Sequence, residues 1–119
     1  MIVSYHAAIL EQFVGKTVGD GSDVAYVRAV TIAPSSGIWR SGERVRDSLN
    51  LLKGTAIATF MAGHYYDGAA GNWAAIYLSQ DASGIRVLCQ EAGYPVHEEV
   101  IPWTAPAAEN AGELFHVIE

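Results

Sequence analysis

The chain has one thiol, four histidines and several aspartates from which a reactive site can be built. Its only cysteine, Cys89, closes the alternation Ile85, Val87, Cys89, which is typical of a strand whose alternate side chains face the interior. A buried thiol away from positive charge is inert. We therefore expect Cys89 to pack in the core, and one cysteine excludes both an intramolecular disulfide and a multi-cysteine zinc site.

The histidines are weak candidates for chemistry. His6, His97 and His116 show no spacing typical of a metal site. His64 stands in a glycine-containing connection, and a lone loop histidine is more often a solvated surface residue than a catalytic base. We expect no metal and no cofactor, and we keep His64 only as a minor alternative for a base.

Three aspartates can be read in two ways. Asp20, Asp23 and Asp67 offer oxygen ligands for calcium, but Asp-x-Gly-x-Asp turns are common as plain helix caps and the remaining calcium-loop signature is absent. Asp23 has its simplest role as an N-cap or first-turn acid, which contributes about 0.5–2 kcal/mol to a helix. Helix capping is therefore the favoured interpretation.

The elements that would position these residues change character along the chain. Residues 5–14 predict a short amphipathic helix after Ser4, and a second helix begins at Ser22 or Asp23. Residues 35–53 predict a loop and a short helical segment. The side chains expected to face inward from the two helices are Ile9, Phe13, Val14, Val24, Val27 and Ile32.

Strand patterns follow from residue 55 onward. Residues 55–61, 73–80, 85–90 and 113–118 predict strands, and Asp81-Ala-Ser-Gly84 predicts a tight hairpin with Gly84 in the left-handed conformation. Pro95, Pro102 and Pro106 are expected to break the intervening segment into loop with at most one short strand. Helices followed by strands predict a single α+β domain over residues 1–119, with helices on one face of a small antiparallel sheet.

Charge and hydropathy limit the classes of binding partner and the cellular location that we expect. The net charge is -6, and residues 87–119 contain six acidic side chains and no lysine or arginine. Such a surface repels phosphate, so nucleic acid and anionic membranes are poor partners. No apolar run approaches the roughly 20 residues of a membrane span, and the N-terminus lacks a secretory signal. We expect a protein that is cytoplasmic as synthesised and that any export uses a signal-independent system.

Several blocks of residues carry a family resemblance. They are Gly19-x-Gly21 before a helix, Trp39-Arg40-x-Gly42, Gly54-Thr-Ala-Ile-Ala-Thr-Phe60, Gly71-Asn-x-Ala-Ala-Ile-Tyr-x-Ser-Gln-Asp81 and Phe115-x-Val-Ile-Glu119. Over nearly its whole length the chain resembles a small bacterial family of cysteine amidases, which is similar to the NlpC and CHAP-type peptidoglycan hydrolases. The resemblance implies a papain-like fold with a catalytic cysteine at a helix start, a histidine at a strand start and a polar residue on the next strand.

The reactive residues of that pattern are replaced in this chain. Asp23 stands at the cysteine position, Trp73 at the histidine position, and Gln90, next to Cys89, at the third position. An aspartate is a poor nucleophile for an amide because the anhydride lies uphill and the amine leaves unprotonated unless an acid is nearby. Tryptophan neither takes nor gives a proton at neutral pH. The resemblance therefore predicts the fold rather than the usual thiol chemistry.

Our main hypothesis is a catalytically degenerate binding module for a peptide, a cell-wall fragment or a protein partner. Trp73 then either fills the space of the histidine or floors a recognition cleft with other aromatic residues. The alternative is a peptidoglycan amidase of the type VI secretion effector kind with non-standard catalytic groups, and a third possibility is an interaction subunit that does not use the cleft. The residues expected to contact a ligand are Asp23, Trp39, Tyr65, Tyr66, Asn72, Trp73 and Gln90.

Overall fold

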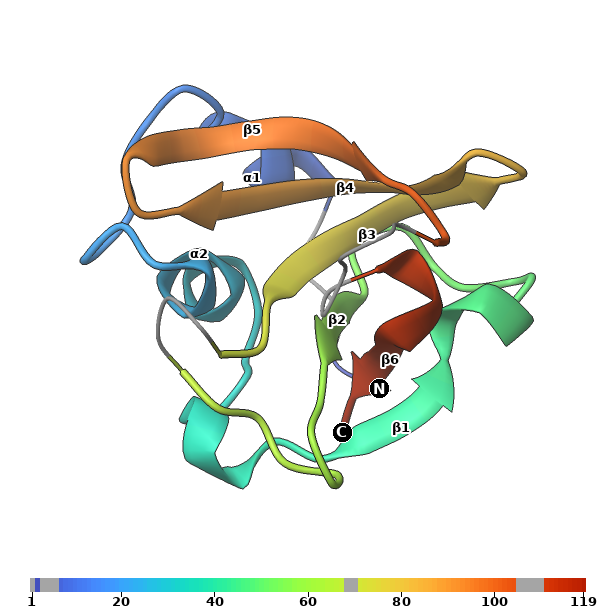
Figure 1. The fold of residues 1–119 in the computed structure, drawn as a ribbon. Helices are drawn as coiled ribbons and strands as arrows, with labels where there is room; N and C mark the ends of the chain where they lie inside the picture. The colour runs from blue at the N-terminus through green and yellow to red at the C-terminus, as the bar shows by residue number, and fades with distance from the viewer. Residues whose placement is uncertain (1, 3–6, 68–70, 105–110) are drawn as a thin grey trace.

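The computed structural model describes residue 2 and residues 7–67, 71–104 and 111–119. Its strands form one antiparallel sheet in the order β1-β6-β2-β3-β4-β5, strongly curved in Figure 1. The α+β class predicted from the sequence is therefore confirmed. The strands are β1 (Ser41–Arg44), β2 (Ala56–Thr59), β3 (Ala74–Asp81), β4 (Gly84–Glu91), β5 (Tyr94–Ile101) and β6 (Phe115–Ile118).

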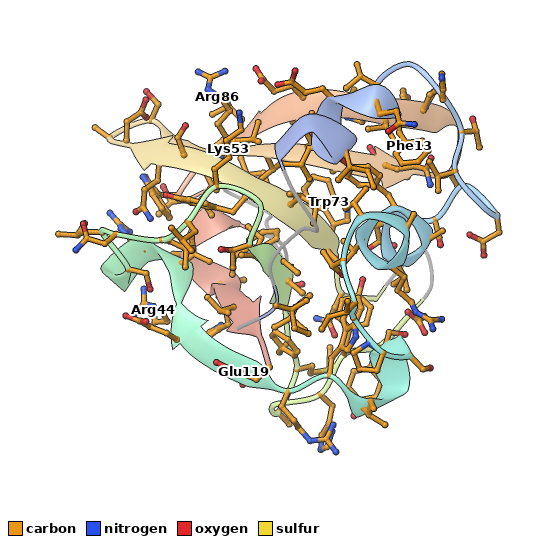
Figure 2. The ribbon with its side chains drawn as sticks, turned by 180° about the vertical axis from the view of Figure 1, so that it is seen from behind. Phe13, Arg44, Lys53, Trp73, Arg86 and Glu119 are labelled. Carbon is orange, nitrogen blue, oxygen red and sulfur yellow. The ribbon has the colours of Figure 1, made fainter. Side chains whose placement is uncertain are left out.

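Two α-helices lie on one side of this sheet. They are α1 (Ala7–Gln12) and α2 (Asp23–Val30), and short 3-10 turns occupy Ser36–Ile38, Val45–Asp47 and Gly112–Leu114. Figure 1 shows α1 behind β4 and β5, and the reverse view in Figure 2 shows it in front of them. In the described part of the chain, no helix is long and apolar enough to cross a membrane.

The sheet has apolar side chains on both faces. On the face that we call the helix face, Tyr26, Val27 and Val30 of α2 pack with sheet residues such as Ala74 and Leu88. The second cluster, on the far face, includes Val45, Ile57, Ala75, Tyr77, Ile85, Val87, Cys89, Ile101, Trp103 and Phe115. Residues next to each other on one strand therefore face different surroundings, as the two-residue period of a strand requires.

The start of α2 follows the predicted capping chemistry. Ser22 is the N-cap, and its hydroxyl accepts a hydrogen bond from the Ala25 N–H at 3.2 Å. Gly21 has a φ of 86°, a conformation that glycine adopts without steric cost. The turn that the sequence indicated is thus present, and it delivers Asp23 as the first residue of the helix.

The helices are shorter than their patterns predicted, and some predicted inward residues are wrong. The α2 helix ends at Val30, so Ile32 lies beyond it and is 73% exposed. In α1, which ends at Gln12, Leu10 is fully buried whereas Val14 is 47% exposed. Ser4 and Tyr5, where the first helix was expected to begin, lie outside the described residues.

One strand was missed from the sequence, and another is longer than the sequence predicted. The segment expected to contain at most one short strand holds the eight-residue β5, and residues 35–53 contain β1. Both strands are at sheet edges, and an edge strand tolerates proline at positions that donate no ladder hydrogen bond. This explains how Pro95 fits within β5, whereas Pro106 lies outside the described residues.

The hairpin between β3 and β4 is confirmed, and so is the positive φ predicted for its glycine. Asp81 pairs directly with Gly84, whose φ is 147°. A Cβ at this position would lie 2.1 Å from the carbonyl oxygen of Ile101. Glycine is required here both by this backbone conformation and by the close approach to Ile101 of β5.

Candidate functional site

Asp23 joins the start of α2 to the start of β3. Its Oδ2 accepts a hydrogen bond from the Tyr65 hydroxyl at 2.5 Å and another from the Ala74 N–H at 2.7 Å. Two segments that are about 50 residues apart in the sequence thus meet at one carboxylate oxygen. This is the junction at which the resemblance placed a reactive helix start beside a strand start.

The environment shifts the acidity of this carboxyl group. Burial raises the pKa of Asp23 above its ordinary value, and the hydrogen bonds from Tyr65 and Ala74 oppose but do not cancel that rise. Burial and the neighbouring Asp23 charge also raise the pKa of Tyr65, so this phenol stays protonated and donates. The junction therefore holds a carboxyl group that takes up a proton more readily than an exposed aspartate.

Gln90 holds the loop before α2. Its side chain is fully buried on β4, where Oε1 accepts from the Val18 N–H at 2.7 Å. Its Nε2 donates to the carbonyls of Val18 at 2.9 Å and Ser22 at 2.8 Å. These bonds place Gln90 beside the helix start, as predicted, but they commit its amide to the backbone rather than to a ligand.

Asn72 closes the loop that precedes β3. Its Oδ1 accepts from the Tyr66 N–H at 2.9 Å, its own N–H donates to the Tyr66 carbonyl at 2.8 Å, and its Nδ2 donates to Thr59 Oγ1 at 3.3 Å. A Cβ on the preceding Gly71 would meet the Tyr66 carbonyl oxygen at 2.2 Å. The Gly71-Asn72 pair therefore shapes this connection.

Trp73 does not face Asp23. Its side chain packs against the far-face cluster and makes an edge contact with Phe115, with ring centroids 6.1 Å apart, while Ala74 lies on the helix face. The backbone of Trp73 pairs with Thr59 on β2. The expectation that Trp73 stands opposite Asp23 is wrong, because strand alternation turns it to the other side of the sheet.

The predicted aromatic floor is not assembled either. Trp39 is fully buried and Tyr65 nearly so, with their ring centroids 4.9 Å apart in the helix-face core. Tyr66 is 49% exposed, whereas Trp73 belongs to the far face. Of these four residues only Tyr65 touches Asp23, and it does so through its hydroxyl group.

The remaining aspartates and histidines are placed separately. Asp20 accepts from the Ser22 N–H at 3.0 Å within its own turn, whereas Asp67 accepts from the hydroxyl of Ser36, 31 residues earlier in the chain. His64 is exposed and forms a backbone bridge with Met61. His6 lies outside the described residues.

A group on the far face was missed from the sequence. Cys89 is buried in the core, as predicted, yet its Sγ lies 3.6 Å from His97 Nε2 and 3.5 Å from Glu99 Oε2. Burial, followed by the charge of Glu99, raises the pKa of the Cys89 thiol strongly, which disfavours a nucleophilic thiolate. The sequence feature that could have revealed this group is the spacing of His97 and Glu99. In a strand, residues two positions apart have side chains on the same face, as these two have in β5.

Comparisons with known proteins place this chain among amidase effectors by sequence and by fold. The family model of domesticated amidase effector 2 matches residues 3–118. A type VI secretion amidase effector 2 protein of Salmonella typhi is 44% identical over 52 residues, which are 44% of this chain and 39% of that relative. The solved structure of a type 6 secretion amidase effector 2 superposes with a TM-score of 0.83 at 26% identity and covers 98% of this chain and 93% of the other.

Proposed function

This chain belongs to the domesticated amidase effector 2 family, and we propose on that basis that it is a type VI amidase effector that cleaves amide bonds of peptidoglycan peptides. The observation that carries the proposal is the Asp23 carboxyl at the junction of α2 and β3, where Oδ2 is held by Tyr65 and by the Ala74 N–H. Asp23 is half-buried, and the proposal requires that its carboxyl group be reached by a ligand.

The chemistry proposed for Asp23 is general base catalysis. Asp23 takes a proton from water as the water oxygen attacks the amide carbon, and a tetrahedral intermediate forms. The protonated carboxyl group then gives that proton to the departing nitrogen as the carbon–nitrogen bond breaks, which leaves a carboxylic acid and an amine. A raised pKa suits this role because the carboxyl group must accept the proton and hold it before returning it.

Cleavage of isolated sacculi tests this proposal. Purified protein is incubated with sacculi, and the soluble muropeptides are separated by chromatography. We expect the wild-type chain to release fragments with new amide-derived termini, and Asp23→Asn to release at least 100-fold less, the lower range for loss of a general base.

Asp20→Asn is the matched control, because Asp20 lies in the same turn but is exposed and caps only Ser22. Its activity should equal that of the wild type. Equal release by wild type and Asp23→Asn would contradict the role of Asp23, and no release by any protein would remove the amidase proposal.

A binding module is the second candidate, favoured by the absence of a thiol and an imidazole at the junction among the described residues. Asp23 holds its hydrogen bonds from Tyr65 and Ala74 there, and the side chain of Trp73 faces the other side of the sheet. In this case the protein would sediment with sacculi without releasing muropeptides. Delivery by a type VI secretion apparatus, a signal-independent system, belongs to the same proposal for either candidate.

A further inference from the structure

Three side chains of different chemistry converge on the far face between β4 and β5. The distances are 3.6 Å from Cys89 Sγ to His97 Nε2, 3.5 Å from Cys89 Sγ to Glu99 Oε2 and 3.3 Å from His97 Nε2 to Glu99 Oε2. Among the described residues, these three side chains are the ones whose histidine, cysteine and carboxylate ligand atoms lie close enough together to share a metal ion. The His97 to Glu99 distance exceeds the usual 2.7–3.2 Å of an N–H···O hydrogen bond.

The other histidine nitrogen fixes how the ring presents itself. His97 Nδ1 lies 2.8 Å from the carbonyl oxygen of Pro95, and a carbonyl only accepts, so Nδ1 carries the proton. In a neutral ring the lone pair of Nε2 then points at Cys89 and Glu99. A lone pair facing a carboxylate oxygen is unfavourable unless a cation or an extra proton lies between them.

The three distances match those around a tetrahedral zinc ion. With zinc–sulfur bonds of about 2.3 Å and zinc–nitrogen or zinc–oxygen bonds of about 2.0–2.2 Å, tetrahedral angles give sulfur–nitrogen and sulfur–oxygen separations of about 3.5–3.6 Å and a nitrogen–oxygen separation of about 3.3–3.4 Å. We propose that Cys89 Sγ, His97 Nε2 and Glu99 Oε2 bind one zinc-like divalent cation. This inference stands independently of the proposed amidase function.

The sheet holds these ligands before any ion arrives. Cys89 pairs with His97 in the β4–β5 register, and Glu99 follows on the same face of β5. The hydrogen bond from His97 Nδ1 to a backbone carbonyl is the usual outer contact that orients a metal-binding imidazole. The pattern differs from a closed structural site, because it supplies three protein ligands.

Charge and exposure suit a partly open site. A thiolate and the Glu99 carboxylate together balance the two positive charges of the ion. Cys89 is fully buried, whereas the side chains of His97 and Glu99 are 35% and 42% exposed, so solvent can supply a fourth ligand. Three protein ligands with a water molecule is the arrangement of open zinc sites.

Cobalt substitution tests the site directly. The metal-free full chain is titrated with Co²⁺, and absorption is recorded for the thiolate-to-cobalt charge-transfer band and the intense visible bands of a tetrahedral ion. We expect one equivalent of Co²⁺ to bind and one equivalent of Zn²⁺ to displace it. Cys89→Ser should abolish the charge-transfer band, and His97→Gln and Glu99→Gln should each weaken zinc affinity at least tenfold.

Two controls keep this result interpretable. Glu98→Gln changes the neighbouring acid, which points to the other face and pairs with Arg86 at 2.9 Å, and His116→Gln changes a histidine on β6. Both should bind cobalt as the wild type does. Glu99→Gln provides the decisive ligand variant if Cys89→Ser fails to fold, because Glu99 is partly exposed.

Absence of the charge-transfer band at millimolar Co²⁺ would overturn the proposal, and the three side chains would then be joined by hydrogen bonds alone. Tight binding that Glu99→Gln and His97→Gln leave unchanged would overturn it as well, because the ion would then occupy another place. Since neither outcome involves sacculi, failure of this site is distinguishable from failure of the amidase proposal.

Discussion

Cys89 and Gln90 are neighbours on β4, yet their side chains lie on opposite faces of the sheet and make different kinds of contact. On the helix face, Gln90 satisfies its amide with three backbone partners and thereby fixes the loop that presents Asp23. On the far face, Cys89 lies within hydrogen-bond distance of His97 and Glu99, and the three distances are also those of ligands around one shared ion. The difference shows that a polar residue near a site can serve the scaffold, and under the proposed metal site a core residue serves as a ligand.

The largest effect is expected from breaking the scaffold on the helix face. Gln90→Leu removes three hydrogen bonds and leaves the Val18 N–H without its acceptor, whereas the carbonyls of Val18 and Ser22 keep bonds from Gly21 N–H and Tyr26 N–H. Because an unpaired buried group costs about 1–3 kcal/mol and each other lost hydrogen bond about 0.5–1.5 kcal/mol, we expect a loss of about 4 kcal/mol in the free energy of unfolding. Urea denaturation measures it. Gln12→Leu, on the exposed surface of α1, should change stability by less than about 0.5 kcal/mol.

Trp73 tests the assignment to the far face. Trp73→Ala removes the packing against Phe115 and should cost about 3 kcal/mol of stability, with ligand binding at the Asp23 junction unchanged. Trp73→Phe should cost much less, since the buried Nε1 has no hydrogen-bond partner among the described residues. Thermal unfolding together with sacculus sedimentation separates the two effects. Lost sedimentation with an unchanged melting temperature would return Trp73 to a binding surface.

Asp23 should show a smaller, graded effect on stability. Asp23→Ala deprives the Ala74 N–H of its acceptor, while the Tyr65 hydroxyl keeps the Asn72 carbonyl at 3.1 Å, so we expect a loss of about 2 kcal/mol. Asp23→Asn retains an acceptor oxygen and should lose less than about 1 kcal/mol. Denaturant unfolding of the two variants checks this order. A larger loss for Asn than for Ala would contradict the hydrogen-bond arrangement.

The smallest effect is a pH dependence carried by Asp23. Because its folded-state pKa is raised above the unfolded value, the folded protein binds the proton more tightly, and the stability contributed by this group falls as pH rises from about 4 through the folded-state pKa. The wild type should therefore lose stability relative to Asp23→Asn across that interval. Unfolding curves of both proteins at several pH values give the difference, and a change of opposite sign would mean that the hydrogen bonds outweigh burial.

The sequence was sufficient to predict the parts of the fold that depend on residues close together in the chain. The cap at Ser22, the hairpin at Asp81–Gly84 and the burial of Cys89 each follow from residues close in the chain. It failed for β5, because Pro95 argues against a strand until the strand is known to be an edge. The papain-like assignment and the single-domain boundary stay predictions.

The site was predicted in part. The meeting of the α2 start with the β3 start was expected from the family resemblance, and Asp23 lies there with Gln90 beside it. The direction of Trp73 was not accessible from composition or spacing, because one residue of strand register decides which face a side chain takes. The group formed by Cys89, His97 and Glu99 could not be predicted from the sequence, because its residues come together only through the pairing of β4 with β5.

The most direct measurement of the central claim is hydrolysis of a peptidoglycan peptide in water enriched in oxygen-18. With Asp23 as general base, the label should enter the new product carboxylate, and the proteolytic fragment containing Asp23 should stay unlabelled after many turnovers. Mass spectrometry reads both, with Asp23→Asn as the inactive control. Label in the Asp23 carboxyl would indicate covalent attack by this side chain, and an unlabelled, uncleaved peptide would contradict an amidase built on Asp23.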